Sequence, residues 1–189
     1  MLWQPRGLTQ PSPYWRRGQG SASTWTTVYT WGGGAADDTG FSGTTFVAVI
    51  AFADFSATGG SRIRLTFDGA ATEGFIADAM YLGNGGGTDA FDFGATPVQV
   101  LMSGGGTITV GAGTSGVVTD DVAFVKDGSN SFVISAHFAD SAHDNMRRAS
   151  GGGNSWYKPG VSEASTVNKT SYTANIASSY IAKIELLIP

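Results

Sequence analysis

The feature that most constrains the fold is a run of short β-prone segments, divided by glycine-rich turns, between Arg62 and Phe138. In the segment 62–67, Ile63, Leu65 and Phe67 alternate with more polar residues, which is the period-two pattern of a half-buried strand. Segments of similar length occur at 25–31, 44–52, 75–82, 97–102, 106–110, 116–125, 131–138 and 180–188. Many short strands at this spacing predict an all-β fold, an antiparallel β-sandwich with jelly-roll-like connectivity.

Two early segments predict how their strands are covered. In 25–31 a regular strand would place Trp25, Tyr29 and Trp31 on one face, which gives a stripe of aromatic side chains. The segment 44–52 is apolar almost throughout, so we expect both of its faces to be buried.

The composition fits one compact domain. A chain of 189 residues with 28 glycines, 41% hydrophobic residues and 14% charged residues is typical of a turn-rich globular protein. It contains no cysteine, which excludes disulfides and thiolate metal sites. We predict a sandwich domain over residues 25–189, preceded by a separate segment at 1–24.

The charge distribution argues against a nucleic-acid partner. The net charge is −4, and the 11 basic residues form no stripe that would neutralise a phosphate backbone. No segment has the roughly 18 consecutive apolar residues of a membrane span, and the first residues lack the apolar run of a signal peptide. We therefore expect a protein made in the cytoplasm of a host cell, with no membrane partner.

The segment 1–24 has the composition of an extended attachment arm. Its three prolines fix the backbone and remove donors, which disfavours a helix or a central strand. Aromatic side chains in such an arm need apolar surface, either on their own domain or on a neighbouring subunit. The residues that we expect to make these contacts are Trp3, Arg6, Tyr14, Trp15, Arg16 and Arg17.

Three aromatic residues lie beside glycine-rich, polar segments and are candidates for carbohydrate binding, because aromatic faces stack on the apolar faces of sugar rings. They are Trp31, Trp156 and Tyr157. The alternative is that these rings pack at the ends of the sandwich or at a subunit interface.

A cluster of histidines and carboxylates is the candidate for a metal site, since imidazole and carboxylate groups suit several transition metals. Its members are His137, Asp140, His143 and Asp144. The alternative is ordinary loop polarity, as it is for the pairs Asp37–Asp38 and Asp120–Asp121, which have no EF-hand spacing. We predict no metal and no cofactor.

The order of the central segments resembles the β-sandwich domain that precedes the catalytic domain in some GDSL/SGNH-type esterases. The stretches that carry the resemblance are RIRLTF (62–67), GFIADAM (74–80), FDFG (91–94), GTITVGAG (106–113), TDDV (119–122) and SFVISAH (131–137). The resemblance covers roughly residues 44–188 and implies a jelly-roll accessory domain.

The family's catalytic motifs are missing from this chain. The family carries its nucleophile in a Gly-Asp-Ser motif after the sandwich, whereas this chain has no such motif and ends at 181–189, about where the catalytic part would begin. The tetrapeptide 140–143 has the Asp-x-x-His spacing of the family's base, but one loop cannot supply both the nucleophile elbow and a distant base. We therefore predict a protein that is not an enzyme.

Two functions remain from these observations. The first is a structural protein of a phage or phage-like virion: a capsid decoration, spike or fibre subunit, attached to other virion proteins by its arm and forming a homo-oligomer. The alternative is a carbohydrate-binding module derived from an esterase accessory domain, which recognises surface polysaccharide. The two can be combined in one virion protein.

Overall fold

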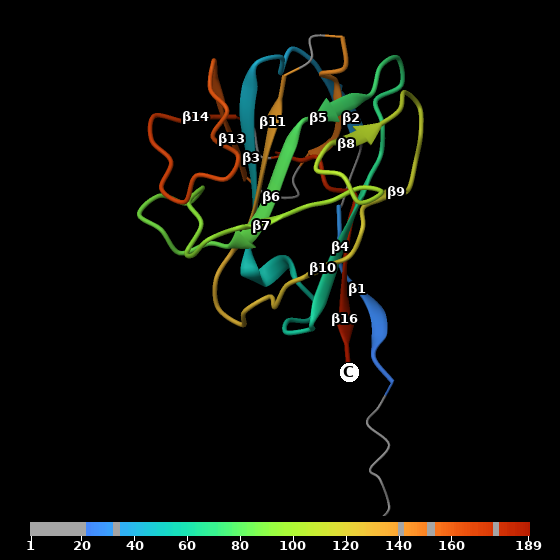
Figure 1. Ribbon diagram of the computed structural model, residues 1–189, viewed down its shortest axis with the longest axis vertical. Coiled ribbons are helices and arrows are strands. Elements are labelled where there is room, and N and C mark those ends of the chain that lie inside the picture. The colour runs from blue at the N-terminus through green and yellow to red at the C-terminus, as the bar shows by residue number, and fades with distance from the viewer. Residues whose placement is uncertain (1–21, 32–34, 140–141, 151–153, 176–177) are drawn as a thin grey trace, which may run out of the picture.

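The computed structural model describes residues 22–31, 35–139, 142–150, 154–175 and 178–189. Within these ranges the protein is all-β and antiparallel, and its two larger sheets form a β-sandwich (Figure 1). The predicted fold class is confirmed, while the jelly-roll connectivity stays a prediction.

The first large sheet contains the first and last strands of the described chain. Its strand order is β1 (Thr24–Thr30), β16 (Lys183–Ile188), β4 (Arg62–Phe67) and β10 (Val122–Ala123), with β9 (Val117–Val118) also paired to β4. The β1–β16 pairing places Thr24 opposite Ile188, so the chain enters the sandwich beside its C-terminal strand (Figure 1).

The second large sheet is built around β3 and β11. Its strand order is β14 (Thr173–Ala174), β13 (Asn154–Pro159), β3 (Thr44–Ile50), β11 (Phe132–Phe138), β6 (Ala79–Asn84) and β7 (Val98–Gln99). Two small sheets complete the fold, one of β15 (Ser178–Ser179), β12 (Met146–Ser150) and β2 (Ala35–Asp38), the other of β5 (Phe75–Ala77) and β8 (Ile108–Val110). A 3₁₀ turn, Phe52–Asp54, follows β3.

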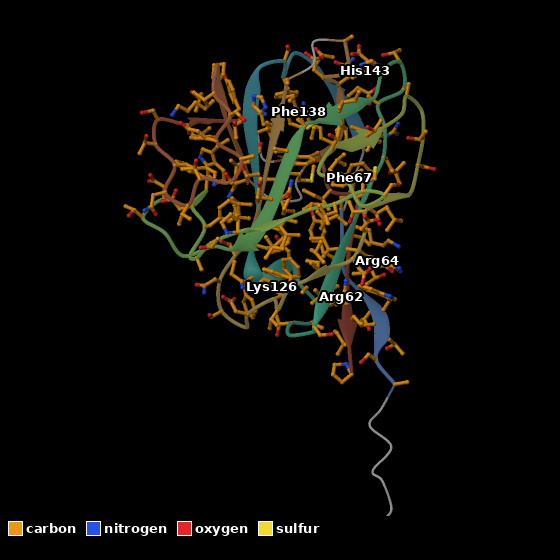
Figure 2. All side chains as sticks on the ribbon, in the orientation of Figure 1. Arg62, Arg64, Phe67, Lys126, Phe138 and His143 are labelled. Carbon is orange, nitrogen blue, oxygen red and sulfur yellow. The ribbon has the colours of Figure 1, made fainter. Side chains whose placement is uncertain are left out.

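The main core lies between the two large sheets. The alternating residues Ile63, Leu65 and Phe67 of β4 are fully buried and belong to the same apolar cluster as Phe138 of β11 (Figure 2). Phe75 connects the two sides, because its ring centroid lies 5.5 Å from that of Phe67 and 5.8 Å from that of Phe138. Burial of aromatic rings of this size is a main source of stability in a chain without disulfides.

A second apolar cluster covers the outer face of the second large sheet. It contains Val47, Val49 and Val133 from the strands, with Phe91 and Phe93 from the loop that follows β6. Every residue of β3 is buried, so the prediction that both faces are covered is confirmed for 44–50, whereas Ala51 and Phe52 at the end of the predicted segment are exposed.

The predicted aromatic stripe along β1 is wrong because the strand contains a bulge. The pairing register with β16 shifts between Thr27 and Tyr29, so the side chains before and after the bulge no longer share a face. Trp25 contacts Arg64 on the outer face of the sheet. Tyr29 instead is buried in the main core, with its ring centroid 6.1 Å from that of Phe55.

Candidate functional site

Trp31 lies at the end of β1 that is distant from Thr24. Its backbone amide donates to Ala182 O at 3.1 Å, which holds the residue against the C-terminal strand region. The side chain is half-buried and lines a cavity of about 320 Å³. This volume is at the small end of the range of ligand pockets and accommodates a group the size of a sugar ring.

The cavity combines this aromatic ring with polar and charged groups. Its other lining residues are Asp68, Gly113, Thr114, Ser115 and Arg147. An aromatic face, hydroxyl groups, a carboxylate and a guanidinium are the groups that sugar recognition uses, because sugars present both apolar C–H faces and many hydroxyls.

Four segments that are distant in the sequence meet at this cavity, namely Trp31, Asp68, the loop 113–115 and Arg147. Asp68 directly follows β4, and Arg147 lies in β12. An isolated bridge between Gly69 and Met146 brings these two neighbours together.

One wall of the cavity is fixed by contacts between the loops 68–71 and 111–116. The Gly69 amide donates to Thr114 O at 2.8 Å, and the Gly113 amide donates to Ala70 O at 2.7 Å. The Gly116 amide donates to Asp68 Oδ1 at 2.7 Å. A wall that is formed before a ligand arrives reduces the entropy cost of binding.

Glycine at position 69 is required by this close packing. A Cβ atom built on Gly69 would overlap the carbonyl oxygen of Gly111. The sequence therefore uses glycine here so that two backbones can approach one another.

The other two aromatic candidates lie away from Trp31. Trp156 and Tyr157 are adjacent in β13, and their side chains enter different environments. Trp156 packs in the outer cluster, 5.5 Å from Phe91 between ring centroids. Tyr157 packs against the main core and lines a separate cavity of about 290 Å³ with residues that include Thr39 and Asn175. The structure therefore does not join the three rings in one site.

A third cavity, of about 240 Å³, is lined by residues that include Asn84, Asp127 and Asn130. Its carboxylate is already bonded within the protein, since Asp127 Oδ1 accepts from the Asn130 amide at 2.8 Å and Oδ2 accepts from Asn130 Nδ2 at 2.7 Å. Burial alone would raise the pKa of Asp127, but the hydrogen bonds from Asn130, Ser129 and Lys126 together hold that pKa well below its usual value. These contacts indicate a structural role for the carboxylate.

The candidate cluster of histidines and carboxylates is divided among protein contacts. His137 Nδ1 lies 2.7 Å from Asp78 Oδ1, and Asp144 Oδ2 accepts from the Ser42 amide at 3.0 Å. His143 is exposed at one end of the sandwich (Figure 2). Asp140 lies outside the described residues. Among the residues that the structure describes, no group of three or more metal-binding side chains is gathered.

Three of the paired aspartates make contacts within the described part of the protein. Asp37 Oδ2 accepts from the Ala71 amide at 2.9 Å, and Asp120 Oδ2 accepts from the Gly104 amide at 2.7 Å. Asp121 forms an exposed ion pair with Arg62.

The arrangement of His137 and Asp78 is the geometry of a base held by a carboxylate. Ser135 is two residues before His137 on the same strand, so both side chains lie on the same face. Ser135 is completely buried, and its hydroxyl makes no hydrogen bond with any described residue. A substrate carbonyl cannot reach this hydroxyl in the folded protein, so the three residues do not form a working nucleophile site.

Residues 1–21 of the predicted attachment arm lie outside the part of the chain that the structure describes, and Thr24 is the first residue of β1. The range 1–21 includes all six of the arm's predicted contact residues, Trp3, Arg6, Tyr14, Trp15, Arg16 and Arg17. Within the described ranges there is no helix of the length and hydrophobicity that crossing a bilayer requires.

Sequence reasoning identified Trp31 but missed the other residues that line its cavity. Asp68 resembles any polar residue at the end of a strand, and Arg147 belongs to β12, which the hydrophobic pattern did not predict. No periodicity in the sequence indicates that the two meet.

Comparison with known proteins adds no relative, since no family model and no curated protein matches this chain.

Proposed function

We propose that this protein is a non-enzymatic binding module that holds carbohydrate in the cavity beside Trp31. The observation that carries the proposal is the meeting of this half-buried ring with Asp68, Thr114, Ser115 and Arg147 around a cavity of about 320 Å³. The ring supplies a stacking surface, and the polar side chains supply donors and acceptors for hydroxyl groups.

A glycan-binding experiment tests the proposal. The protein is applied to an array of bacterial and host surface polysaccharides, and positive glycans are then titrated by calorimetry. We expect Trp31→Ala to weaken binding at least tenfold. Trp25→Ala is the matched control, because Trp25 is a half-buried tryptophan on β1, the strand that Trp31 directly follows, and it contacts Arg64 outside the cavity. Equal loss of binding in both variants, or no glycan bound by the wild type, would contradict the proposal.

We also propose that the module is a structural protein of a phage or phage-like virion, as a capsid decoration, spike or fibre subunit. The supporting observation is the separation of the two ends of β1. The strand begins at Thr24 beside Ile188, and Trp31 follows its far end, about 20 Å away at the rise of a β-strand. A segment before β1 that grips a particle would therefore leave the cavity accessible.

Sedimentation of virions tests this second proposal. Particles from the producing organism are separated on a density gradient, and mass spectrometry is used to ask whether the protein travels with capsid and tail proteins. Removal of residues 1–21 keeps all of β1 and is expected to abolish co-migration without unfolding the sandwich. Absence of the intact protein from every particle fraction would overturn the virion assignment and leave the glycan proposal standing.

The resemblance of residues 44–188 to the accessory domain of GDSL/SGNH-type esterases bears on the proposed binding function. We propose that the sandwich has the role of such a domain without esterase activity, which fits the buried Ser135 hydroxyl beneath the His137–Asp78 pair. Hydrolysis of short-chain acyl esters by the purified protein, lost in His137→Ala, would contradict it.

A further inference from the structure

Arg147 is the cation of the Trp31 cavity. It lies on β12 directly after Met146, whose bridge to Gly69 places this strand against the end of β4. Its side chain is half-buried and lines the cavity. Arg147 forms no hydrogen bond or ion pair with any of the described residues, so its guanidinium donors remain available to a carboxylate.

Two aspartates near Arg147 accept hydrogen bonds from backbone amides instead of pairing with its guanidinium. Asp37 is opposite Arg147 in the β2–β12 pairing, but its Oδ2 accepts from the Ala71 amide at 2.9 Å. Asp68 lines the same cavity, but its Oδ1 accepts from the Gly116 amide at 2.7 Å. Both carboxylates hold loops of the cavity wall, and neither lies within ion-pair distance of the guanidinium.

We propose that the cavity binds a sugar that carries a carboxylate, such as a uronic acid or a sialic acid, with the carboxylate on Arg147. This inference rests on the proposed carbohydrate function. Arginine binds carboxylates through two parallel N–H···O bonds, which a neutral sugar cannot accept in the same way.

The remaining groups fix the orientation of such a sugar. The apolar face of the ring stacks on Trp31, while Asp68 keeps its Oδ2 available to accept from a sugar hydroxyl. Thr114 Oγ1 donates its proton to Gly111 O at 2.7 Å, so toward a ligand it is an acceptor. The negative charge of Asp68 repels the ligand's carboxylate from its own side of the cavity, which favours the Arg147 side and disfavours a sugar with two acid groups.

The test compares matched acidic and neutral sugars with the full-length protein. Calorimetry or ligand-observed NMR measures binding of galacturonate against galactose, glucuronate against glucose, and N-acetylneuraminate. We expect at least one acidic sugar to bind at least tenfold tighter than its neutral partner, with a difference that falls as salt is raised. Arg147→Gln should remove this difference, and Arg147→Lys should keep part of it. A thermal melt of each variant checks that it is folded.

The possible outcomes separate this inference from the function on which it rests. Equal affinity of the wild type for acidic and neutral sugars would overturn the role of Arg147 and keep the carbohydrate function. Preference for acidic sugars that persists in a folded Arg147→Gln protein would also overturn it. Failure of the wild type to bind any glycan on the array and any sugar in this panel would overturn both.

Discussion

Arg64 on β4 stacks on the ring of Trp25 on β1, with its guanidinium carbon 4.4 Å from the ring centroid. This contact crosses β16, which lies between the two strands in the first large sheet. Glu185 on β16 accepts from Arg64 Nε at 2.8 Å, and Lys183 Nζ lies 3.2 Å from the same carboxylate oxygen. The Glu185 carboxylate therefore connects β16 to β4, and the Arg64 guanidinium extends this contact to Trp25 of β1.

Replacing Glu185 should destabilise the fold more than replacing an exposed carboxylate. We expect Glu185→Gln to lower the free energy of unfolding by about 1–2 kcal/mol, since the carboxylate is nearly buried and accepts charge-assisted hydrogen bonds. The matched control is Asp121→Asn, which breaks the exposed pair with Arg62 and should cost less than about 0.5 kcal/mol. Urea denaturation of both variants measures the difference, and equal costs would contradict the prediction.

The Glu185 effect should also depend on pH. Burial by itself raises the pKa of Glu185, but hydrogen bonds and charge attraction from Arg64 and Lys183 outweigh it and hold the pKa below its usual value. A carboxylate with a lowered pKa in the folded state stabilises the fold above its unfolded pKa and loses that contribution as pH falls. The gap between wild type and Glu185→Gln should therefore shrink as the pH is lowered below about 4.5.

Removal of the Tyr180 hydroxyl should stabilise the protein. Tyr180 is fully buried, and its hydroxyl has no hydrogen-bond partner among the described residues. A buried hydroxyl without a partner gives up its hydrogen bonds to water and forms none in the protein, which destabilises the folded state. Tyr180→Phe should therefore raise the free energy of unfolding by about 1 kcal/mol. In the control Tyr172→Phe, the lost hydroxyl contacts Glu163 Oε2 at 3.4 Å, so no gain is expected. Thermal melts of the two variants measure the change in stability. An equal gain in stability in both would contradict the role of the unpaired Tyr180 hydroxyl.

A side chain at position 69 should disrupt the wall of the Trp31 cavity. Gly69→Ala places a methyl group onto the Gly111 carbonyl oxygen, and we expect a loss of more than about 2 kcal/mol together with weaker glycan binding. Gly105→Ala is the matched control, because a methyl group there would lie 3.6 Å from Met102 O, which is an ordinary van der Waals contact. A stable Gly69→Ala protein that binds glycan as tightly as the wild type would show that the loop contact is not required.

Lys169 should make the fold more stable in mildly alkaline solution. It is buried with its Nζ 3.8 Å from the Phe93 ring centroid, and burial lowers its pKa to about 8, against attraction from Asp92 and Glu163. Since the unfolded chain holds this proton up to about pH 10.5, the free energy of unfolding should rise by about 1–2 kcal/mol between pH 7.5 and 9.5. Denaturant titrations across this range should show a smaller rise in Lys169→Met, and an equal rise would assign the effect to other groups.

The sequence predicted those strands whose apolar residues alternate or run continuously. The segment 62–67 coincides with β4, and 131–138 differs from β11 by one residue. The segment 75–82 is divided into β5 and β6 at Asp78, whose backbone amide donates to His137 O and whose carboxylate contacts the His137 ring. A local pattern does not reveal such a break, since its cause is a contact with a distant strand.

Other strands carry no local signal that separates them from loops. The strand β2 consists of two alanines and two aspartates, residue types that are depleted in strands, and it pairs with β12, which begins with Met146 and two arginines. These strands exist because the sandwich brings them together at one end. The same reason hides the Trp31 cavity, which depends on the pairing of Gly69 with Met146 rather than on any motif.

The antiparallel pairing of β1 with β16 also determines how the protein would carry a mechanical load. A pull on the chain before Thr24, opposed by a ligand held near Trp31, acts along the length of β1. The hydrogen bonds from Thr24 to Thr30 then resist shear together, instead of opening one after another from a free end. With the attachment proposed above, β1 would therefore act as a tether that resists detachment under tension.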